Sequence, residues 1–336
     1  MSIQVGPLVM RNRVFLAPMA GITDVPFRAS AWRNGAGLVM TEMVASEELL
    51  SGAENVRRRA CNDGIHPFAV QLAGREARWM ECGARAAAQL GADLIDINLG
   101  CPSRMVAGKL SGAALMRDPD RALALVEATL RGAGPVPVSI KMRLGWDSQS
   151  LTAPEIARRA EAAGVRMITI HARTRNQFYK GRADWRAVRQ VRRAISIPLI
   201  INGDIVDEAT ARAALSQSGA DGIMTGRGCQ GRPWFAGELA ERLDPGTGIR
   251  PLSLARQLRE TRRLFEDMLA FHGEEAGLRQ SRKHLGWAVE RWRQAGLLDC
   301  QAAGAWRAQL VRENDVAIVR QNMDRLADTL LNMKAA

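Results

Sequence analysis

Eight short apolar runs, separated by stretches of helical periodicity, constrain the fold of this chain more than any other feature. Most of the runs do not alternate apolar with polar residues, which is typical of parallel strands buried on both faces. The runs occupy residues 14–19, 38–43, 68–72, 94–98, 138–142, 167–171, 199–202 and 222–225, and helical stretches between them include 76–90, 154–163 and 207–215. Eight βα units within about 245 residues have the size and rhythm of a (β/α)8 TIM barrel. We therefore predict an α/β fold of this kind, because the alternative, a doubly wound sheet, usually has fewer units.

The rhythm changes after a Pro/Gly-rich stretch at residues 244–248. No convincing strand follows it, and residues 252–271, 278–295 and 302–336 have helical patterns. We predict a small C-terminal all-helical domain. In this division residues 1–244 form the barrel domain and residues 245–336 form the helical domain.

Composition excludes several classes of protein. A hydrophobic content of 47% is ample for a core, while no apolar stretch approaches the length of a membrane span. Residues 1–9 lack the pattern of a secretory signal. The histidines lack ligand spacing, and the cysteines are far apart with no C-x-x-C pair: Cys61, Cys82, Cys101, Cys229 and Cys300. This pattern argues against a disulfide framework, structural zinc or an iron–sulfur cluster. We expect a cytoplasmic protein without a metal or a membrane partner.

The chain is strongly basic, with a formal net charge of +12 and a sequence pI of about 10.6. Such a surplus favours a polyanionic partner, although an arginine-rich composition also raises the pI without one. One basic group in the predicted helical domain is opposed only by Glu290 and consists of Arg279, Arg282, Lys283, Arg291 and Arg293. Charge runs are usually solvated faces, so this group alone does not establish nucleic-acid binding.

Cys101 lies directly after a predicted strand, in Asn98-Leu99-Gly100-Cys101-Pro102. Many cysteines are buried and inert, but one between Gly and Pro at a strand exit is poorly placed to fill a core. In parallel α/β proteins the carboxyl ends of the strands carry the active site. We therefore interpret Cys101 as a functional residue.

Other predicted strands also end in polar residues, among them Lys141 and His171. A cation at either position could stabilise negative charge on an electron-rich ring such as a reduced flavin. A buried lysine needs a partner or a ligand, whereas an isolated histidine is often only hydrogen-bonded to the backbone. The seventh and eighth strands end in Asn202-Gly203-Asp204 and Thr225-Gly226-Arg227-Gly228. These turns predict a phosphate site built from backbone N–H groups and a helix N-terminus.

Taken together, the motifs are similar to those of the tRNA-dihydrouridine synthases. The shared segments are 17–24, 98–102, 109–113, 140–143, 171–174, 202–204 and 226–227, covering residues 7–234 in the right order. Gln230-Gly231-Arg232-Pro233-Trp234 is most similar to the bacterial B-type subgroup, and Arg282-Lys283-His284 also fits the family. No G-x-S-x-G elbow supports a serine hydrolase.

The resemblance implies FMN in the barrel mouth, NADPH as reductant and tRNA as substrate. It further implies that hydride passes from the flavin to C6 of a D-loop uridine, uridine 17 for the B-type subgroup, and that Cys101 as general acid protonates C5. An ordinary thiol is protonated at neutral pH, which agrees with that role. The residues implied to contact FMN are Pro18, Met19, Ala20, Gln71, Lys141, His171, Asn202, Gly203, Asp204, Gly226 and Arg227.

The target uracil must be swung out of folded tRNA to reach such a pocket, which requires contacts with the RNA elsewhere. We expect Asn98 to orient the uracil. The candidates for tRNA contact are Arg104, Lys109, Arg143, Arg173 and Lys180 in the barrel, and Arg279, Arg282 and Lys283 in the helical domain. We expect a monomer. The competing interpretations are an FMN-dependent reductase of a small ene or pyrimidine substrate, and a non-catalytic tRNA-binding protein.

Overall fold

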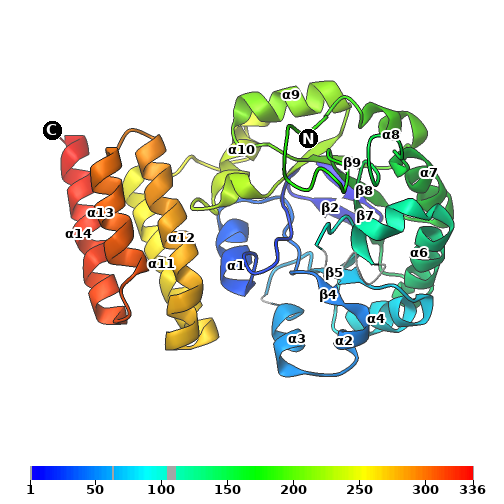
Figure 1. The fold of residues 1–336 in the computed structure, drawn as a ribbon, viewed down its shortest axis with the longest axis horizontal. Coiled ribbons are helices and arrows are strands. Elements are labelled where there is room, and N and C mark those ends of the chain that lie inside the picture. The colour runs from blue at the N-terminus through cyan, green and yellow to red at the C-terminus, as the bar shows by residue number, and fades with distance from the viewer. Residues whose placement is uncertain (1, 63, 104–110, 336) are drawn as a thin grey trace.

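A computed structural model describes residues 2–62, 64–103 and 111–335. An α/β barrel is followed by a helical bundle that lies beside it, with the C-terminus at the far end of the bundle (Figure 1). The strands are β1 (Ile3–Val5), β2 (Leu8–Met10), β3 (Val14–Leu16), β4 (Val44–Ala45), β5 (Ala69–Ala73), β6 (Leu94–Leu99), β7 (Val138–Arg143), β8 (Met167–His171), β9 (Leu199–Asn202) and β10 (Gly222–Thr225). The barrel helices are α1 (Val25–Arg33), α2 (Ser46–Leu49), α3 (Glu54–Arg59), α4 (Ala77–Gln89), η1 (Gly112–Arg117), α6 (Pro119–Ala133), α7 (Ala153–Ala163), α8 (Arg189–Ala194), α9 (Glu208–Ser218), η2 (Arg227–Cys229) and α10 (Phe235–Leu243). The bundle consists of α11 (Leu254–His272), α12 (Glu274–Gln294), α13 (Cys300–Val311) and α14 (Val316–Ala335).

The central sheet is parallel and has the strand order β3-β10-β9-β8-β7-β6-β5-β4. Residues 37–41 connect its two ends. The Leu16 N–H donates to the carbonyl of Leu38 at 2.9 Å, and the Thr41 N–H donates to the carbonyl of Ala69 at 3.0 Å. These bonds join the β3 side to the β5 side, so the predicted (β/α)8 barrel with C-terminal helices is confirmed.

The second predicted strand, at residues 38–43, differs from the prediction. Met40 forms an isolated bridge with Ala69, and regular pairing resumes only where Val44 meets Leu72. Between these two pairs, three residues on this segment (41–43) oppose two on β5 (70 and 71), which defines a β-bulge. An apolar run shows where an extended segment lies, but an inserted residue in the ladder depends on the partner strand.

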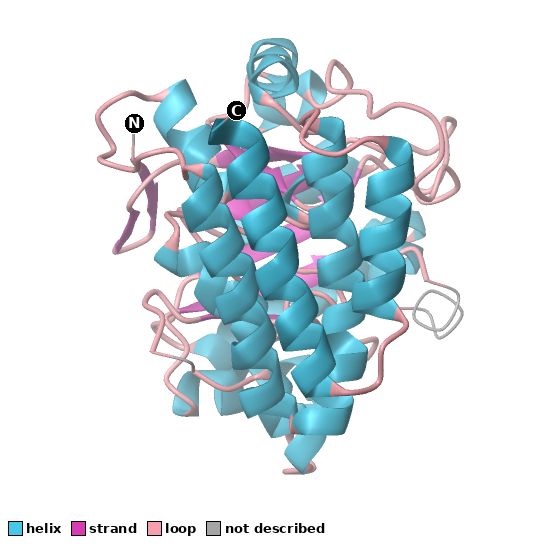
Figure 2. Cartoon of the chain, turned by 90° about the vertical axis from the view of Figure 1, so that its left-hand side faces the viewer, coloured by secondary structure: helices cyan, strands magenta, loops and turns pink. Residues whose placement is uncertain are grey.

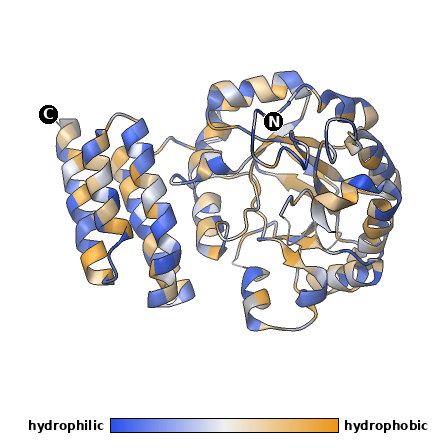
Figure 3. Ribbon diagram, in the orientation of Figure 1, coloured by the Kyte–Doolittle hydropathy of each residue, from blue (hydrophilic) through white to orange (hydrophobic). Residues whose placement is uncertain are grey.

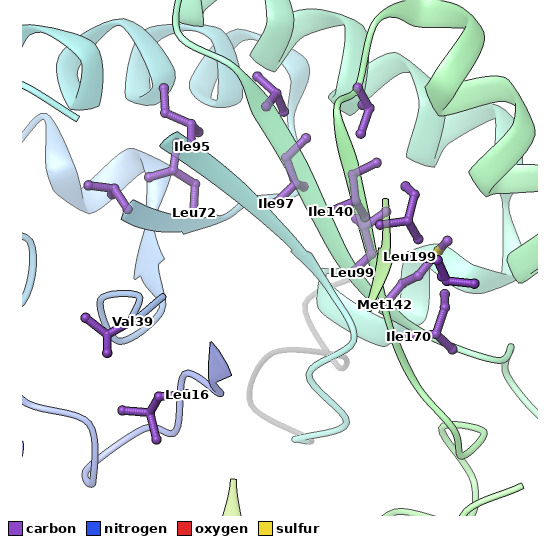
Figure 4. Packing of buried hydrophobic residues seen from close by; sticks show 14 of the residues in the cluster. Leu16, Val39, Leu72, Ile95, Ile97, Leu99, Ile140, Met142, Ile170 and Leu199 are labelled. Carbon is purple, nitrogen blue, oxygen red and sulfur yellow. The ribbon is translucent and has the colours of Figure 1, made fainter. Parts of the chain in front are cut away.

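Successive side chains along the strands alternate between the apolar core outside the sheet and the interior of the barrel. In β6, Ile95 and Ile97 belong to the core between sheet and helices, and in Figure 4 they and Ile140 point toward the surrounding helices. Asp96 and Asn98 occupy the intervening positions and face the barrel interior, because successive side chains point to opposite faces of a strand. The polar interior is therefore set by every second residue of strands whose other face is apolar.

A small antiparallel hairpin of β1 and β2, which the sequence interpretation did not anticipate, covers the amino-terminal end of the barrel. Ile3, Val5 and Met10 form an apolar cluster with interior residues such as Phe15 and Ile200. This cluster fills the amino-terminal half of the barrel interior. In β6, Leu94 belongs to this cluster, and the interior polar residues Asp96 and Asn98 follow it toward the carboxyl end of the strand.

The predicted barrel helices form within a few residues of their expected bounds. Residues 76–90 correspond to α4, 154–163 to α7 and 207–215 to α9. Asp207 caps α9 by accepting a hydrogen bond from the Thr210 N–H at 2.7 Å, and Gly164 ends α7 at φ +115°. Side-chain caps and left-handed glycines are local signals, which is why the sequence located these ends well.

The bundle has its own apolar core, in which Leu310, Val319, Leu326 and Leu330 are almost fully buried. The helices α11 to α14 stand in front of the barrel strands when the molecule is viewed from the bundle side (Figure 2). Each carries hydrophobic and hydrophilic residues (Figure 3), as expected for amphipathic helices packed around a shared core.

Helices α11 and α12 contact the barrel directly. The Arg33 guanidinium of α1 forms an ion pair with Glu260 at 3.0 Å, and His272 Nε2 lies 2.7 Å from an Asp24 carboxylate oxygen. The imidazole of His284 packs against the Phe27 ring with centroids 5.1 Å apart. Burial lowers the pKa of His284 to about 3, so this side chain is neutral in the interface.

Candidate active site

The loop after β6 presents Cys101 at the barrel mouth through the side chain of Asn98. Asn98 Oδ1 accepts hydrogen bonds from the N–H groups of Gly100 at 3.0 Å and Cys101 at 2.9 Å. Its Nδ2 donates to Gln71 Oε1 at 2.8 Å. Asn98, which we expected to orient a uracil, therefore also shapes the loop that carries Cys101.

A buried carboxylate organises the interior side chains below this loop. Asp96 accepts hydrogen bonds from Gln71 Nε2 and Ser139 Oγ, each at 2.7 Å. Burial raises the pKa of Asp96, although these two hydrogen bonds and the charge of Lys141 oppose that effect. Burial and then repulsion from Arg143 lower the pKa of Lys141 to about 8, while attraction to Asp96 acts in the opposite direction.

Lys141 faces the mouth cavities with its positive charge retained at neutral pH. Asp96 is its electrostatic partner, but the ammonium donates no hydrogen bond to the described part of the chain. A buried ammonium with unused donors is costly unless a ligand accepts them. The sequence predicted a partner or a ligand for Lys141; the structure supplies Asp96 as a charge partner, and the unused N–H donors leave room for a ligand as well.

His171 is not the cation that we considered for the end of the sixth predicted strand. Burial, with repulsion from Lys141 and three arginines, holds the pKa of His171 well below its ordinary value. Arg173 Nη1 lies 3.3 Å from His171 Nε2. Because a guanidinium can only donate, Nε2 is the acceptor and the neutral ring carries its proton on Nδ1. Lys141 therefore supplies the positive charge, and His171 is a neutral hydrogen-bonding group.

The turns after β9 and β10 form one end of the mouth. Asp204 adopts φ +55° and accepts hydrogen bonds from Arg173 Nη2 at 2.6 Å and Arg227 Nη2 at 3.0 Å. A Cβ on Gly228 would come within 2.6 Å of the carbonyl oxygen of Ile205, so close packing of the two turns requires glycine there.

The sequence predicted that a helix N-terminus would contribute to a phosphate site, but the helices that follow β9 and β10 do not offer one. Helix α9 is capped by its own Asp207, and β10 leads into the three-residue η2. The backbone N–H groups of Gly203, Gly226, Arg227 and Gly228 have no acceptor among the described residues. These groups, rather than a long helix, provide the donors that an anion would use.

Two adjoining cavities occupy the mouth, with volumes of about 340 and 560 Å³. Their combined size lies in the range of cofactor pockets. Every residue predicted to contact FMN lines one or both of them, and so do Asn98, Cys101 and Arg143. The residues common to both are Pro18, Met19, Lys141, His171, Tyr179, Arg227 and Gln230.

The residues expected to contact tRNA fall into different environments. Arg104 and Lys109 lie outside the described residues. Arg173 is 1% exposed, and its guanidinium bonds to the Gly181 carbonyl and Asp204, so the expected contact of this residue with tRNA is corrected to a supporting role. Arg143 is equally buried, and its Nε holds the Gly100 carbonyl at 2.8 Å beside Cys101.

The remaining candidates also differ among themselves. Lys180 and Arg279 are exposed. Arg282 bonds to Asn314 Oδ1 at 2.6 Å, within the bundle. Lys283 points to the barrel, where its Nζ donates to the Gly21 carbonyl, and burial lowers its pKa. Lys283 thus connects the bundle to the loop after β3.

Several residues of the site were not singled out from the sequence. Asp96 could have been found as an ionisable residue inside an apolar strand, and Tyr179 as the chain's single tyrosine. Tyr179 is 51% exposed at the junction of the two cavities, and the guanidinium carbons of Arg143 and Arg227 lie 5.5 and 5.6 Å from its ring centroid. No local signal predicted that Arg291 would line the cavity, because it arrives from the bundle.

The fold and the site define a (β/α)8 barrel protein whose cavity, at the carboxyl ends of its strands, is lined by cationic side chains. A family model described as "Dihydrouridine synthase (Dus)" matches residues 15–331. The chain therefore belongs to the dihydrouridine synthase family.

Relatives support this assignment over most of the chain. A probable tRNA-dihydrouridine synthase of Rhizobium leguminosarum bv. phaseoli is 54% identical over 304 residues, covering 90% of this chain and 93% of the relative. The tRNA-dihydrouridine synthase B of Xanthomonas campestris pv. campestris is 42% identical over 285 residues, covering 84% and 86% of the two chains. The resemblance to the B-type subgroup is confirmed by relatives of that name.

Solved structures share the fold at low sequence identity. Morphinone reductase superposes with a TM-score of 0.54 at 16% identity, covering 73% of this chain and 91% of that one. An old yellow enzyme homologue from Zymomonas mobilis gives a TM-score of 0.54 at 15% identity, covering 75% of this chain and 93% of that one.

Among the described residues, no helix has the length and apolar character needed to cross a membrane. The same residues contain no cluster of His, Cys, Asp and Glu suited to a metal ion.

Proposed function

We propose that the protein is a tRNA-dihydrouridine synthase that reduces the C5=C6 bond of a D-loop uridine, uridine 17, using FMN and NADPH. The observation that carries the proposal is the meeting of two groups of residues at the barrel mouth. The Cys101 loop lines one cavity, the glycine turns of β9 and β10 line the other, and Lys141 and His171 line both. An acid and a cofactor site in contact are what reduction of a double bond requires.

The residues present fit a flavin mononucleotide. The N–H groups at Gly203 and Gly226 and the guanidinium of Arg227 suit the phosphate, whereas Lys141, Met19 and Gln71 would border the ring. The unused donors of Lys141 provide an independent reason to expect an anionic or electron-rich group. Bound FMN, reduced by NADPH, supplies the hydride that adds to C6 of the uracil.

Cys101 supplies the matching proton. The new C5–H bond takes the thiol proton and the electron pair of the C5=C6 bond, which leaves a Cys101 thiolate for reprotonation from solvent. Arg143 and Asn98 fix the Gly100–Cys101 backbone from two sides, so the thiol is presented in a defined position. Lys141 keeps positive charge beside the cofactor, and neutral His171 offers an Nδ1–H donor.

RNA contacts besides those with the target uracil come from two surfaces. One is the exposed basic side of α12, where Arg279 lies. The other, which we name the rim ladder, consists of Arg117, Trp146, Arg175 and Phe178. The guanidinium carbons of Arg117 and Arg175 lie 5.0 and 4.6 Å from the Trp146 ring centroid, and that of Arg175 lies 5.9 Å from Phe178. Arginine and aromatic planes both stack on nucleobases, and guanidinium groups also bind phosphates.

The test is position mapping of dihydrouridine by mass spectrometry in tRNA from a strain that lacks the gene. We expect loss at one D-loop position, with restoration by the wild-type gene and not by Cys101→Ala. Purified protein should carry FMN and oxidise NADPH faster when tRNA is present.

Other results would select the competing functions. Unchanged dihydrouridine with a yellow protein would contradict the proposal and indicate reduction of a small molecule. Restoration by Cys101→Ala in a colourless protein would indicate a non-catalytic tRNA-binding protein.

A further inference from the structure

Helix α12 of the bundle contributes a side chain to the cavity at the β9 and β10 turns. Arg291 lines this cavity together with Arg227 and Gln230. Its Nε donates to the Gln230 carbonyl at 3.1 Å, and its Nη2 donates to the Arg227 carbonyl at 3.1 Å. Its Nη1 bonds to Gln294 Oε1 at 3.0 Å. The bundle therefore forms part of the wall at this end of the cavity.

The turn after η2 is built to touch this helix. Gly231 has φ +74°, and a Cβ there would lie 2.4 Å from the carbonyl carbon of Trp287. Glycine is the residue that permits both this conformation and this approach. The backbone contact keeps Arg291, one turn further along α12, beside the residue 226–230 turn.

Positive charge exceeds negative charge at this end of the cavity. Asp204 is the one carboxylate among the described lining residues, and it is already bonded to Arg173 and Arg227. A guanidinium has five N–H bonds, and the three hydrogen bonds of Arg291 leave two without an acceptor among the described residues. Burial also lowers the pKa of Arg291, a cost that a bound anion would offset.

Arg291 also orients the backbone of the turn. The C=O and N–H groups of a trans peptide point in opposite directions. The Arg227 carbonyl accepts hydrogen bonds from Arg291 Nη2 and from the Gln230 N–H at 3.2 Å, so the N–H of Gly228 points away from these two donors. Arg232 Nε holds the next carbonyl, that of Gly228, at 2.8 Å. Two arginines thus donate to carbonyls of this turn, while its N–H groups at Gly226, Arg227 and Gly228 have no acceptor among the described residues.

We propose that Arg291 is a phosphate-binding residue for the flavin mononucleotide and that it couples cofactor binding to docking of the bundle on the barrel. This inference rests on the proposed function, because the anion is the phosphate of that cofactor. Coupling is reciprocal: a phosphate that favours the docked bundle is itself bound more tightly when the bundle is docked. The helical half of the chain then completes the cofactor site as well as contacting RNA.

Riboflavin separates this role from a purely structural one, because it has the same ring as flavin mononucleotide but no phosphate. A phosphate contact affects only the phosphorylated flavin. A structural tie affects both flavins equally.

The experiment measures dissociation constants of both flavins, by quenching of flavin fluorescence, for wild-type apoprotein, Arg291→Met and Arg291→Lys. Arg293→Met is the matched control, since Arg293 lies on the same helix but pairs with Glu290 at 2.7 Å. We expect Arg291→Met to weaken flavin mononucleotide binding about tenfold and to leave riboflavin binding unchanged. Arg291→Lys should retain part of the selectivity, and Arg293→Met should retain all of it.

Flavin mononucleotide should also raise the melting temperature of the wild type more than riboflavin does, and this difference should shrink in Arg291→Met. Equal weakening of both flavins, or no change in either, would overturn the inference while leaving the proposed function intact. Failure of the wild type to bind either flavin would overturn both.

Discussion

The barrel mouth and the bundle are both rich in arginine, yet they use it differently. In the mouth, Arg143 and Arg173 are each 1% exposed and donate to backbone carbonyls such as those of Gly100 and Gly181. On the bundle, Arg279 is exposed and donates no hydrogen bond to the described residues. The same side chain therefore fixes loop geometry in one region and supplies surface charge in the other.

This difference shows that a high net charge does not by itself locate a nucleic-acid site. A buried guanidinium is bound by carbonyls and carboxylates, so its charge contributes little at the surface. An exposed guanidinium retains rotamer freedom and long-range attraction for phosphates. Substitutions should consequently separate chemistry and stability in the barrel from RNA affinity in the bundle.

The largest effect should come from replacing a cysteine in the barrel mouth, compared with replacing a cysteine in the bundle. Cys101→Ala should lower the rate of dihydrouridine formation by about 10²- to 10⁴-fold, the usual contribution of a general acid, with flavin and tRNA binding retained. The control is Cys300→Ala at the start of α13, where the cysteine is exposed. Single-turnover assays with tRNA measure both variants. A similar loss in Cys300→Ala, or full turnover by Cys101→Ala, would contradict the division of roles.

A second comparison concerns stability. Arg173→Met removes a buried guanidinium and should lower the free energy of unfolding by about 3 kcal/mol, because two loop carbonyls lose a donor and Asp204 loses one of its donors. Arg279→Met should change it by less than about 0.5 kcal/mol. Urea denaturation of both variants provides the measurement, and equal effects would show that burial does not distinguish the two arginines.

The loss of stability in Arg173→Met should depend on pH. Burial acts to raise the pKa of Asp204, but the hydrogen bonds from Arg173 and the Ala183 N–H, together with the charges of Arg173 and Arg227, outweigh it, so the folded-state pKa is lowered. This stabilisation is present above the unfolded pKa of about 3.9 and is lost as the pH falls through the folded pKa. The gap in stability between wild type and Arg173→Met should therefore narrow in strong acid.

The titration of Lys141 should have a smaller effect on stability and rate, which appears only above about pH 8. Its pKa of about 8 means that the folded state loses this proton before an unfolded lysine does, at about 10.4. The free energy of unfolding should rise with pH between these values, because the unfolded chain then binds more protons. Flavin reduction that depends on the ammonium should slow about tenfold per pH unit above 8. Lys141→Met should abolish both trends in rapid-mixing and denaturation experiments across pH 7–10.

The smallest effects should come from single surface arginines. Arg279→Ala on the bundle should raise the Kd for tRNA about fivefold and reduce the salt slope by about one, and Arg117→Ala on the rim ladder should raise it about threefold. Arg78→Ala is the control, since Arg78 also stacks on a tryptophan, Trp79, at 4.7 Å but on α4. Filter binding across salt concentrations measures all three. Equal losses in all three would mean that net charge alone governs the affinity.

The sequence by itself determined the features that depend on neighbouring residues. Helix ends at Asp207 and Gly164 followed from capping chemistry, and the strand that delivers Cys101 followed from an apolar run stopped by Gly100 and Pro102. Those local signals placed nearly all strands and the cavity-lining residues at the strand ends, because the carboxyl ends of parallel strands converge in a barrel.

Tertiary structure alone decided which charges are buried and what they contact. It made His171 neutral, turned Arg173 inward and placed a bulge beside β5. It also brought Arg291 to a turn more than sixty residues earlier in the chain. Burial and long-range pairing depend on how separate elements pack, and helical or strand periodicity contains no information about the partner that a side chain will meet.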